Sequence, residues 1–108
     1  MRVCVPVTLD GQVGPRWGRA ERLAVAEVAA GQITDWQEFA VDWNTLHDQG
    51  TEGAHHARVA RFLRDNHVET VLAGHMGPPM RAMLNKLGLH VLPAETEDAR
   101  AAVLAAGP

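Results

Sequence analysis

The sequence predicts an α/β fold in which helices pack on the faces of a mixed five-stranded sheet. Two features of the 108-residue chain support this prediction. In the first half, apolar runs at residues 23–28 and 33–41 flank the tight turn Ala30-Gly31, which is the pattern of an antiparallel hairpin. In the second half, strand-like and helix-like segments alternate, which is typical of parallel strands joined by helices.

The predicted strands are short apolar segments bounded by turn residues. Val3–Val7 is apolar on both faces, as expected of a central strand that is covered on both sides. Residues 8–19 are expected to form a loop, because Asp10-Gly11 and Gly14-Pro15 are turn signals. The remaining strands are predicted at residues 23–28, 33–41, 68–73 and 89–92.

The predicted helices are segments in which apolar residues recur at helical spacing. Met80, Met83, Leu84 and Leu87 form one such stripe, and Gly88 ends it. Helices are expected over residues 51–66, 78–87 and 95–106, with a loop over 42–50. The resulting order, βββαβαβα, is similar to the ribonuclease H-like arrangement.

Composition predicts one domain over residues 1–108 and narrows the classes of partner. The net charge of −3 provides no basic surface for nucleic acid. Cys4 is the only cysteine, so the chain cannot form an internal disulfide or a cysteine-rich metal framework, and a reducing cytoplasm is expected. No apolar run approaches the roughly 18–20 residues that span a membrane, so no membrane contact is predicted.

The most informative segment is the loop expected after the strand at residues 68–73. It reads Gly74-His75-Met76-Gly77 and is followed by two prolines, which are tolerated in the first turn of a helix. In a parallel sheet this loop lies at the carboxyl end of a strand, where such folds bind ligands. His75 and Met76 are therefore candidate ligands, since a thioether suits soft metals. The alternatives are an exposed histidine and a methionine packed beneath the loop.

Histidines are concentrated in the middle of the chain. Five of the six fall between residues 47 and 75. His47 lies in a loop expected to open at the same edge as residues 74–77, and His55 and His56 begin the helix over 51–66. The side chains of His55 and His56 point about 100° apart on a helix, so only one of these two is expected to reach a shared ion. Three imidazoles from His47, His55 or His56, and His75 would suit zinc, copper or iron.

Cys4 and Trp17 are weaker candidates. Cys4 is a candidate metal ligand, but it lies inside a strand expected to be buried, where a free cysteine usually packs as a small apolar residue. Trp17 could cover a bound cofactor, although packing in the core is the usual role of a tryptophan.

Three segments, in order along nearly the whole chain, resemble the dinitrogenase iron–molybdenum cofactor biosynthesis family. The third matches that family's Ala-Gly-Gly-Met-Gly-Pro motif, with His75 in place of its second glycine. Arg16 stands where members of the family often have histidine. The segments are Met1–Val7 with Asp10-Gly11, Trp17–Leu23, and Ala73–Pro78 with Leu84 and Gly88–Val91.

The resemblance implies a non-enzymatic protein that binds or carries an iron–sulfur or molybdenum-containing cluster. Its partner would be a protein that synthesises or receives that cofactor. Carried over by motif, the residues expected at the cofactor are Trp17, Gly74, Met76 and Gly77.

Two other functions stay open at this point. The histidine count and His75 suit a mononuclear copper or zinc protein, and a third reading is a metal-free interaction module. Catalysis is not indicated, because the chain lacks a Gly-x-Ser-x-Gly elbow and a phosphate-binding loop. A nuclease is not indicated either, since the first strand carries no acidic residue with which to hold metal ions.

Overall fold

Strand β1 (Arg2–Pro6) lies at the centre of the sheet in the computed structural model, which describes residues 1–106. The strand order is β3-β2-β1-β4-β5. β1 pairs antiparallel with β2 and parallel with β4, while β3 pairs antiparallel with β2 and β5 parallel with β4. The predicted mixed sheet, its hairpin and its parallel half are therefore confirmed. The other strands are β2 (Arg22–Ala29), β3 (Gln32–Ala40), β4 (Thr70–Ala73) and β5 (His90–Pro93).

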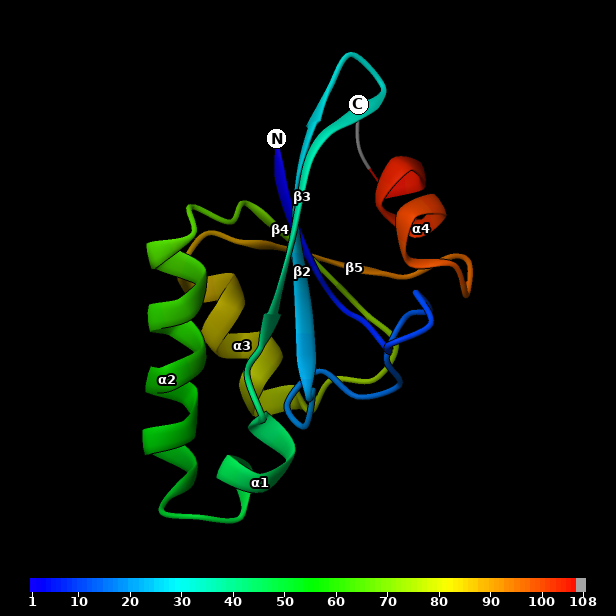
Figure 1. The fold of residues 1–108 in the computed structure, drawn as a ribbon. Coiled ribbons are helices and arrows are strands. Elements are labelled where there is room, and N and C mark those ends of the chain that lie inside the picture. Colours follow the sequence, from blue (N-terminus) through cyan, green and yellow to red (C-terminus); the bar gives the residue numbers. More distant parts are fainter. Residues whose placement is uncertain (107–108) are drawn as a thin grey trace.

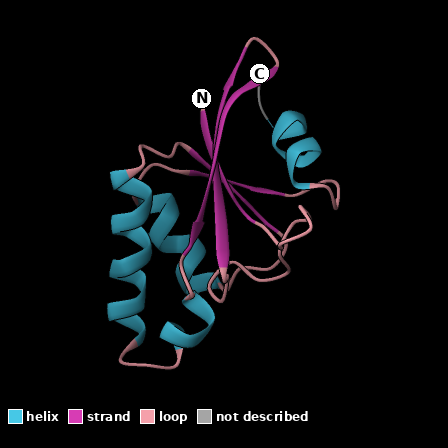
Figure 2. Cartoon of the chain, viewed as in Figure 1, coloured by secondary structure: helices cyan, strands magenta, loops and turns pink. Residues whose placement is uncertain are grey.

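Helices cover both faces of the sheet, as predicted (Figure 1). Helices α1 (Trp43–His47), α2 (Glu52–Asp65) and α3 (Pro78–Lys86) lie on one side of the sheet, and α4 (Ala99–Ala106) lies on the other. Figure 2 shows the same view coloured by secondary structure.

The sheet separates two apolar cores, and alternate residues of β1 face each of them. Cys4 belongs to the core beneath α2 and α3, whereas Val3 and Val5 belong to the core beneath α4. All three side chains are fully buried. This explains why β1 is apolar on both faces, since neither face of a central strand meets water.

Two predictions of secondary structure were wrong. Residues 42–50 were expected to form a loop, but they include the short helix α1, which is anchored by the buried Trp43. The last helix was expected from residue 95, yet it begins at Ala99, because the Asp98 carboxylate accepts the backbone N–H of Ala101 at 2.9 Å and caps the first turn. The observed order is therefore βββααβαβα.

Helix α3, which follows the loop of residues 74–77, forms as its sequence predicts. Gly77 is its N-cap residue, and two prolines occupy its first two positions. Met80 and Leu84 are buried beneath it. Gly88, with φ of 82°, provides the left-handed backbone that ends it.

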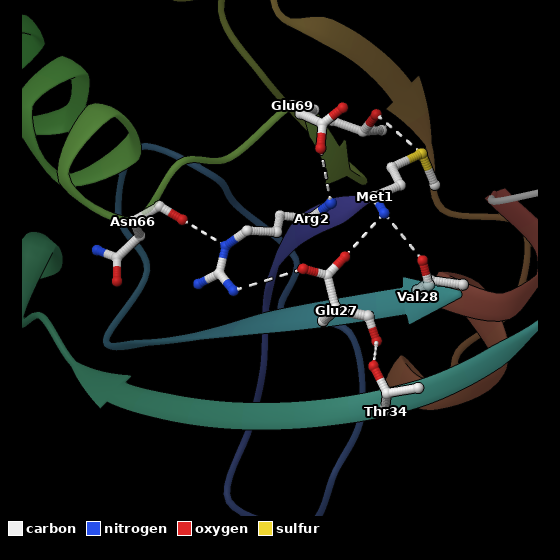
Figure 3. A network of polar contacts seen from close by, with 8 residues as sticks. Met1, Arg2, Glu27, Val28, Thr34, Asn66 and Glu69 are labelled. Atoms are coloured by element: carbon white, nitrogen blue, oxygen red, sulfur yellow. Dashed lines mark hydrogen bonds and ion pairs between the residues drawn. The ribbon is translucent and has the colours of Figure 1, made fainter.

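A polar network joins the amino ends of β1 and β4 to β2 (Figure 3). The Met1 ammonium donates to Glu27 Oε2 at 2.8 Å and to the Val28 carbonyl at 2.9 Å. Arg2 Nε donates to the Asn66 carbonyl at 2.6 Å, and its guanidinium lies 3.9 Å from the Glu27 carboxylate. The hydrogen bond from the ammonium holds the pKa of Glu27 below its ordinary value.

We expect Glu27→Gln to lower stability at neutral pH and to have less effect in acid. Because the pKa of Glu27 is lowered by folding, its stabilising contribution is complete above the unfolded value of about 4.3 and is lost as the pH falls through the folded value. Urea denaturation at neutral pH and near pH 3 measures the difference. The exposed Glu97→Gln is the control, and an equal effect of Glu27→Gln at both pH values would contradict the prediction.

Candidate functional site

Two loops lie side by side at the carboxyl end of the parallel strands. The backbone N–H of Trp17 donates to the carbonyl of His75 at 3.0 Å, and Arg16 forms an isolated parallel bridge with His75. The His75 side chain is exposed, while Met76 turns towards the core and is 8% exposed. Residues 14–19 and 74–77 therefore form one surface, although they are far apart in the sequence.

An open hollow of about 490 Å³ lies between these loops and the end of α1. The residues that line it carry two guanidinium groups, two imidazoles and the largely buried thioether of Met76. Cations attract anionic ligands, whereas imidazole and thioether bind transition metals. The lining residues are Arg16, Gly18, Arg19, His47, His75, Met76 and Gly77.

The hollow contains only part of the predicted set. Of the predicted metal ligands, His47 and His75 line it, and of the predicted cofactor residues, Met76 and Gly77 do. Gly74 does not line it but lies close to the other loop, because a Cβ added at Gly74 would be 3.5 Å from the Pro15 carbonyl oxygen.

Arg16 and Arg19 line the hollow but were not predicted as site residues. They flank Trp17-Gly18 in the loop over residues 8–19, and this pair of cations in a turn-rich loop was the available signal.

His55 is held as a structural residue rather than left open to a ligand. Its side chain is buried, with Nε2 at 2.8 Å from the Gly18 carbonyl and Nδ1 at 2.8 Å from Arg58 Nη1. The carbonyl requires Nε2 to donate and the guanidinium requires Nδ1 to accept, so the ring is neutral. Burial, the largest cause, lowers the pKa of His55. Neither nitrogen is available to a metal ion in this arrangement.

His56, Cys4 and Trp17 lie outside the hollow's lining. His56 Nε2 lies 3.7 Å from Glu52 on its own helix. Burial raises the pKa of the Cys4 thiol, which keeps it protonated and unsuited to bind metal. The Trp17 ring is fully buried and packs edge-on against Trp43, with centroids 5.4 Å apart. Within residues 1–106, its Nε1 has no hydrogen-bond partner.

The predicted set of three imidazoles is not formed. In the part of the chain that the structure describes, no group of three or more His, Cys, Asp or Glu side chains is arranged to hold a metal ion. The reason is local, because both nitrogens of His55 are engaged and His56 lies beside Glu52.

An ion-pair cluster stands behind one wall of the hollow. Arg19 Nη2 and Nη1 lie 3.0 and 3.3 Å from the two carboxylate oxygens of Asp48. His47 Nδ1 lies 3.5 Å from Asp48 Oδ1, and the His47 ring packs against His55 with centroids 5.0 Å apart. The hydrogen bond from Arg19, followed by His47, lowers the pKa of Asp48.

A larger hollow, of about 820 Å³, adjoins the first and shares Arg16 and Arg19 with it. Its lining includes Pro6, Leu9 and Pro15 but no histidine, cysteine or methionine. The smaller hollow is therefore the better candidate for a ligand that contains metal and sulfide, because it alone of the two combines arginines with imidazole and thioether side chains, whereas the larger one has the carboxylates of Glu21 and Asp42 beside its arginines.

The chain belongs to the family described as dinitrogenase iron–molybdenum cofactor, which matches residues 1–107. The resemblance inferred from the three segments is thus confirmed. No curated protein matches the chain.

Solved structures share the fold over most of their length. The crystal structure of PH0822 has a TM-score of 0.74 at 19% identity, covering 96% of this chain and 85% of that one. The apo form of the orange protein from Desulfovibrio gigas has a TM-score of 0.73 at 26% identity, with coverage of 94% and 82%. TM1290 from Thermotoga has a TM-score of 0.64 at 22% identity, with coverage of 94% and 83%.

Among the described residues, no helix has the length and apolar character needed to cross a membrane.

We expect His55→Ala to lower the free energy of unfolding by about 1–3 kcal/mol, because it removes the partners of the Gly18 carbonyl and Arg58. Urea denaturation measures this, with the exposed His90→Ala as control. Since folding lowers the pKa of His55, the wild-type protein loses this advantage as the pH falls below the unfolded value of about 6.5. A difference that grows in acid would contradict the assignment of a neutral, structural His55.

Proposed function

We propose that this protein binds and carries a metal–sulfur cluster of the iron–molybdenum type, with the smaller hollow as the cargo site. The observation that supports this most strongly is the meeting of Arg16, Arg19, His47, His75 and Met76 around one open hollow. Membership of a family described by the dinitrogenase cofactor supports the same class of cargo.

The lining suits a cluster that is held and later released. Metal–sulfide clusters carry negative charge, which Arg16 and Arg19 would attract. His75 and His47 offer imidazole ligands, and Met76 offers a soft sulfur at the edge of the core. A small number of protein ligands in an open site favours transfer to a second protein over permanent retention.

The proposal of a carrier role extends to the partners of this protein. We propose no catalytic step, and the partners would be proteins that synthesise or receive the cofactor, in the cytoplasm. The orange protein, 26% identical, is described in an apo form.

We also propose that the sheet has the ribonuclease H-like arrangement expected from the sequence, because β2 is the one strand of the five that runs antiparallel to the others.

The two alternative functions have less support. A mononuclear copper or zinc site needs a converging set of ligands, which residues 1–106 do not contain. A metal-free interaction module leaves the grouping of imidazole, thioether and guanidinium side chains unexplained.

Anaerobic loading tests the proposal. We expect purified protein incubated with ferrous iron, sulfide and molybdate, or with tetrathiomolybdate alone, to retain metal and sulfide after desalting and to show visible absorption. Elemental analysis and spectroscopy measure both. Retention no greater than that of an unrelated protein of similar size would overturn the proposed function.

We expect His75→Ala to weaken tetrathiomolybdate binding by about tenfold or more, since a lost ligand worth about 1.4 kcal/mol is a factor of ten. The exposed side chain makes the stability change small, within about 0.5 kcal/mol. Equilibrium titration and thermal unfolding measure the two effects. The control is the exposed His90→Ala, and equal affinity in both variants would remove His75 from the site.

Charge attraction predicts a dependence on salt. We expect binding to weaken as ionic strength rises, because the screening length falls from about 10 Å at 0.1 M to about 3 Å at 1 M. Arg16→Gln should reduce both the affinity and its salt dependence, whereas the exposed Arg61→Gln on α2 should change neither. Titrations at several salt concentrations decide this, and identical behaviour of the two variants would argue against a role for Arg16.

A further inference from the structure

We propose that Asp48 is a positioning residue for the cargo hollow, which it does not itself line. Its carboxylate holds Arg19 in place and presents His47 to the hollow through Nε2. This inference rests on the proposed function, since it concerns the same hollow.

The contact with Arg19 fixes the direction of a guanidinium group. Two N–H groups of Arg19 face the two oxygens of Asp48, at 3.0 and 3.3 Å, and such a bidentate pair constrains the plane of the guanidinium. Arg19 is half-buried and lines the hollow, so its remaining N–H groups are kept at that wall. Without Asp48, the long side chain would be released into solvent.

The contact with His47 favours one tautomer. Asp48 Oδ1 lies 3.5 Å from His47 Nδ1, which is longer than an ordinary hydrogen bond, and its negative charge favours the form of the neutral ring that carries the proton on Nδ1. Nε2 then keeps its lone pair, and among residues 1–106 it has no hydrogen-bond partner. Carboxylates that orient metal-binding histidines act in this way.

Asp48 is itself held by the short helix α1. It caps the carboxyl end of α1, and its backbone N–H donates to the Thr45 carbonyl at 3.2 Å. The buried Trp43 fixes the other end of that helix in the core. The carboxylate therefore has a rigid base from which to position Arg19 and His47.

Folding stability does not explain this arrangement. The side chain of Asp48 is 67% exposed, and exposed ion pairs contribute little to stability. Removing the carboxylate should therefore weaken binding far more than it weakens folding, which separates a positioning role from a structural one.

Two variants of Asp48 test the inference. With tetrathiomolybdate as the probe, we expect Asp48→Ala to weaken binding by about 10–100-fold, as is typical when the partner of a metal ligand is removed. Asp48→Asn, which keeps an acceptor for His47 but loses charge, should have a smaller effect. Asp65→Ala is the control, because this exposed carboxylate also faces an arginine, Arg64, at 3.8 Å.

A spectroscopic measurement on the cargo-free protein decides the tautomer independently. We expect the side-chain nitrogen shifts of His47 to report a proton on Nδ1 in the wild-type protein and in Asp65→Ala, and a loss of this preference in Asp48→Ala. Equal tautomer populations in all three proteins would overturn the inference.

The binding outcomes distinguish the two proposals. If the wild-type protein and Asp48→Ala bind the probe equally, the positioning role is wrong and the proposed function stands. If the wild-type protein binds no probe, the proposed function fails, while the nitrogen shifts still decide the part assigned to Asp48.

Discussion

The backbone hydrogen bond from Trp17 to His75 is the contact on which the candidate site depends. It joins two loops separated by more than fifty residues, and the Arg16–His75 bridge continues it. The bond can form because β1 and β4 are parallel neighbours, so the loops that follow them leave the sheet at the same edge. Residues from both loops line the hollow, and separating the loops would abolish it.

Aromatic packing supports this joint from inside the molecule. The Trp17 ring contacts Trp43, which in turn packs against His55 and Phe62 with centroids 5.9 Å away in each case. Such pairs contribute about 0.5–1.5 kcal/mol each beyond the burial of their surface. His55 adds a polar link to Gly18. The loop of residues 14–19 is thus held by contacts with the core, while the side chains of Arg16 and His75 stay exposed to solvent.

Much of the fold could be predicted because its signals are local. The hairpin, the parallel strands and the stripe of α3 each follow from neighbouring residues, and so does the loop with His75 and Met76. Helix α1 was missed because five residues are too few to establish a helical period. Which of His55 and His56 is buried could not be predicted either. Adjacent side chains of a helix point about 100° apart, and only the packing of the helix decides which of them is buried.

The electrostatic part of the site could not be found in the same way. Arg19 and Asp48 are 29 residues apart, and nothing in either local sequence indicates that they meet. The same holds for Gly18 and His55, which are 37 residues apart. Contacts of this kind follow from the assembled fold, so they were visible only once α1 and loop 14–19 were placed together.

The hydrogen bond between the loops uses the backbone carbonyl of His75, so the His75 side chain takes no part in it. Any residue that accepts this backbone conformation can make the same bond, and glycine, which the family's motif has at this position, would preserve it. Position 75 is therefore a place where evolution, or a protein engineer, can exchange one exposed side chain for another without repacking the core. Under the proposed function, such an exchange would alter the choice of cargo and leave the fold unchanged.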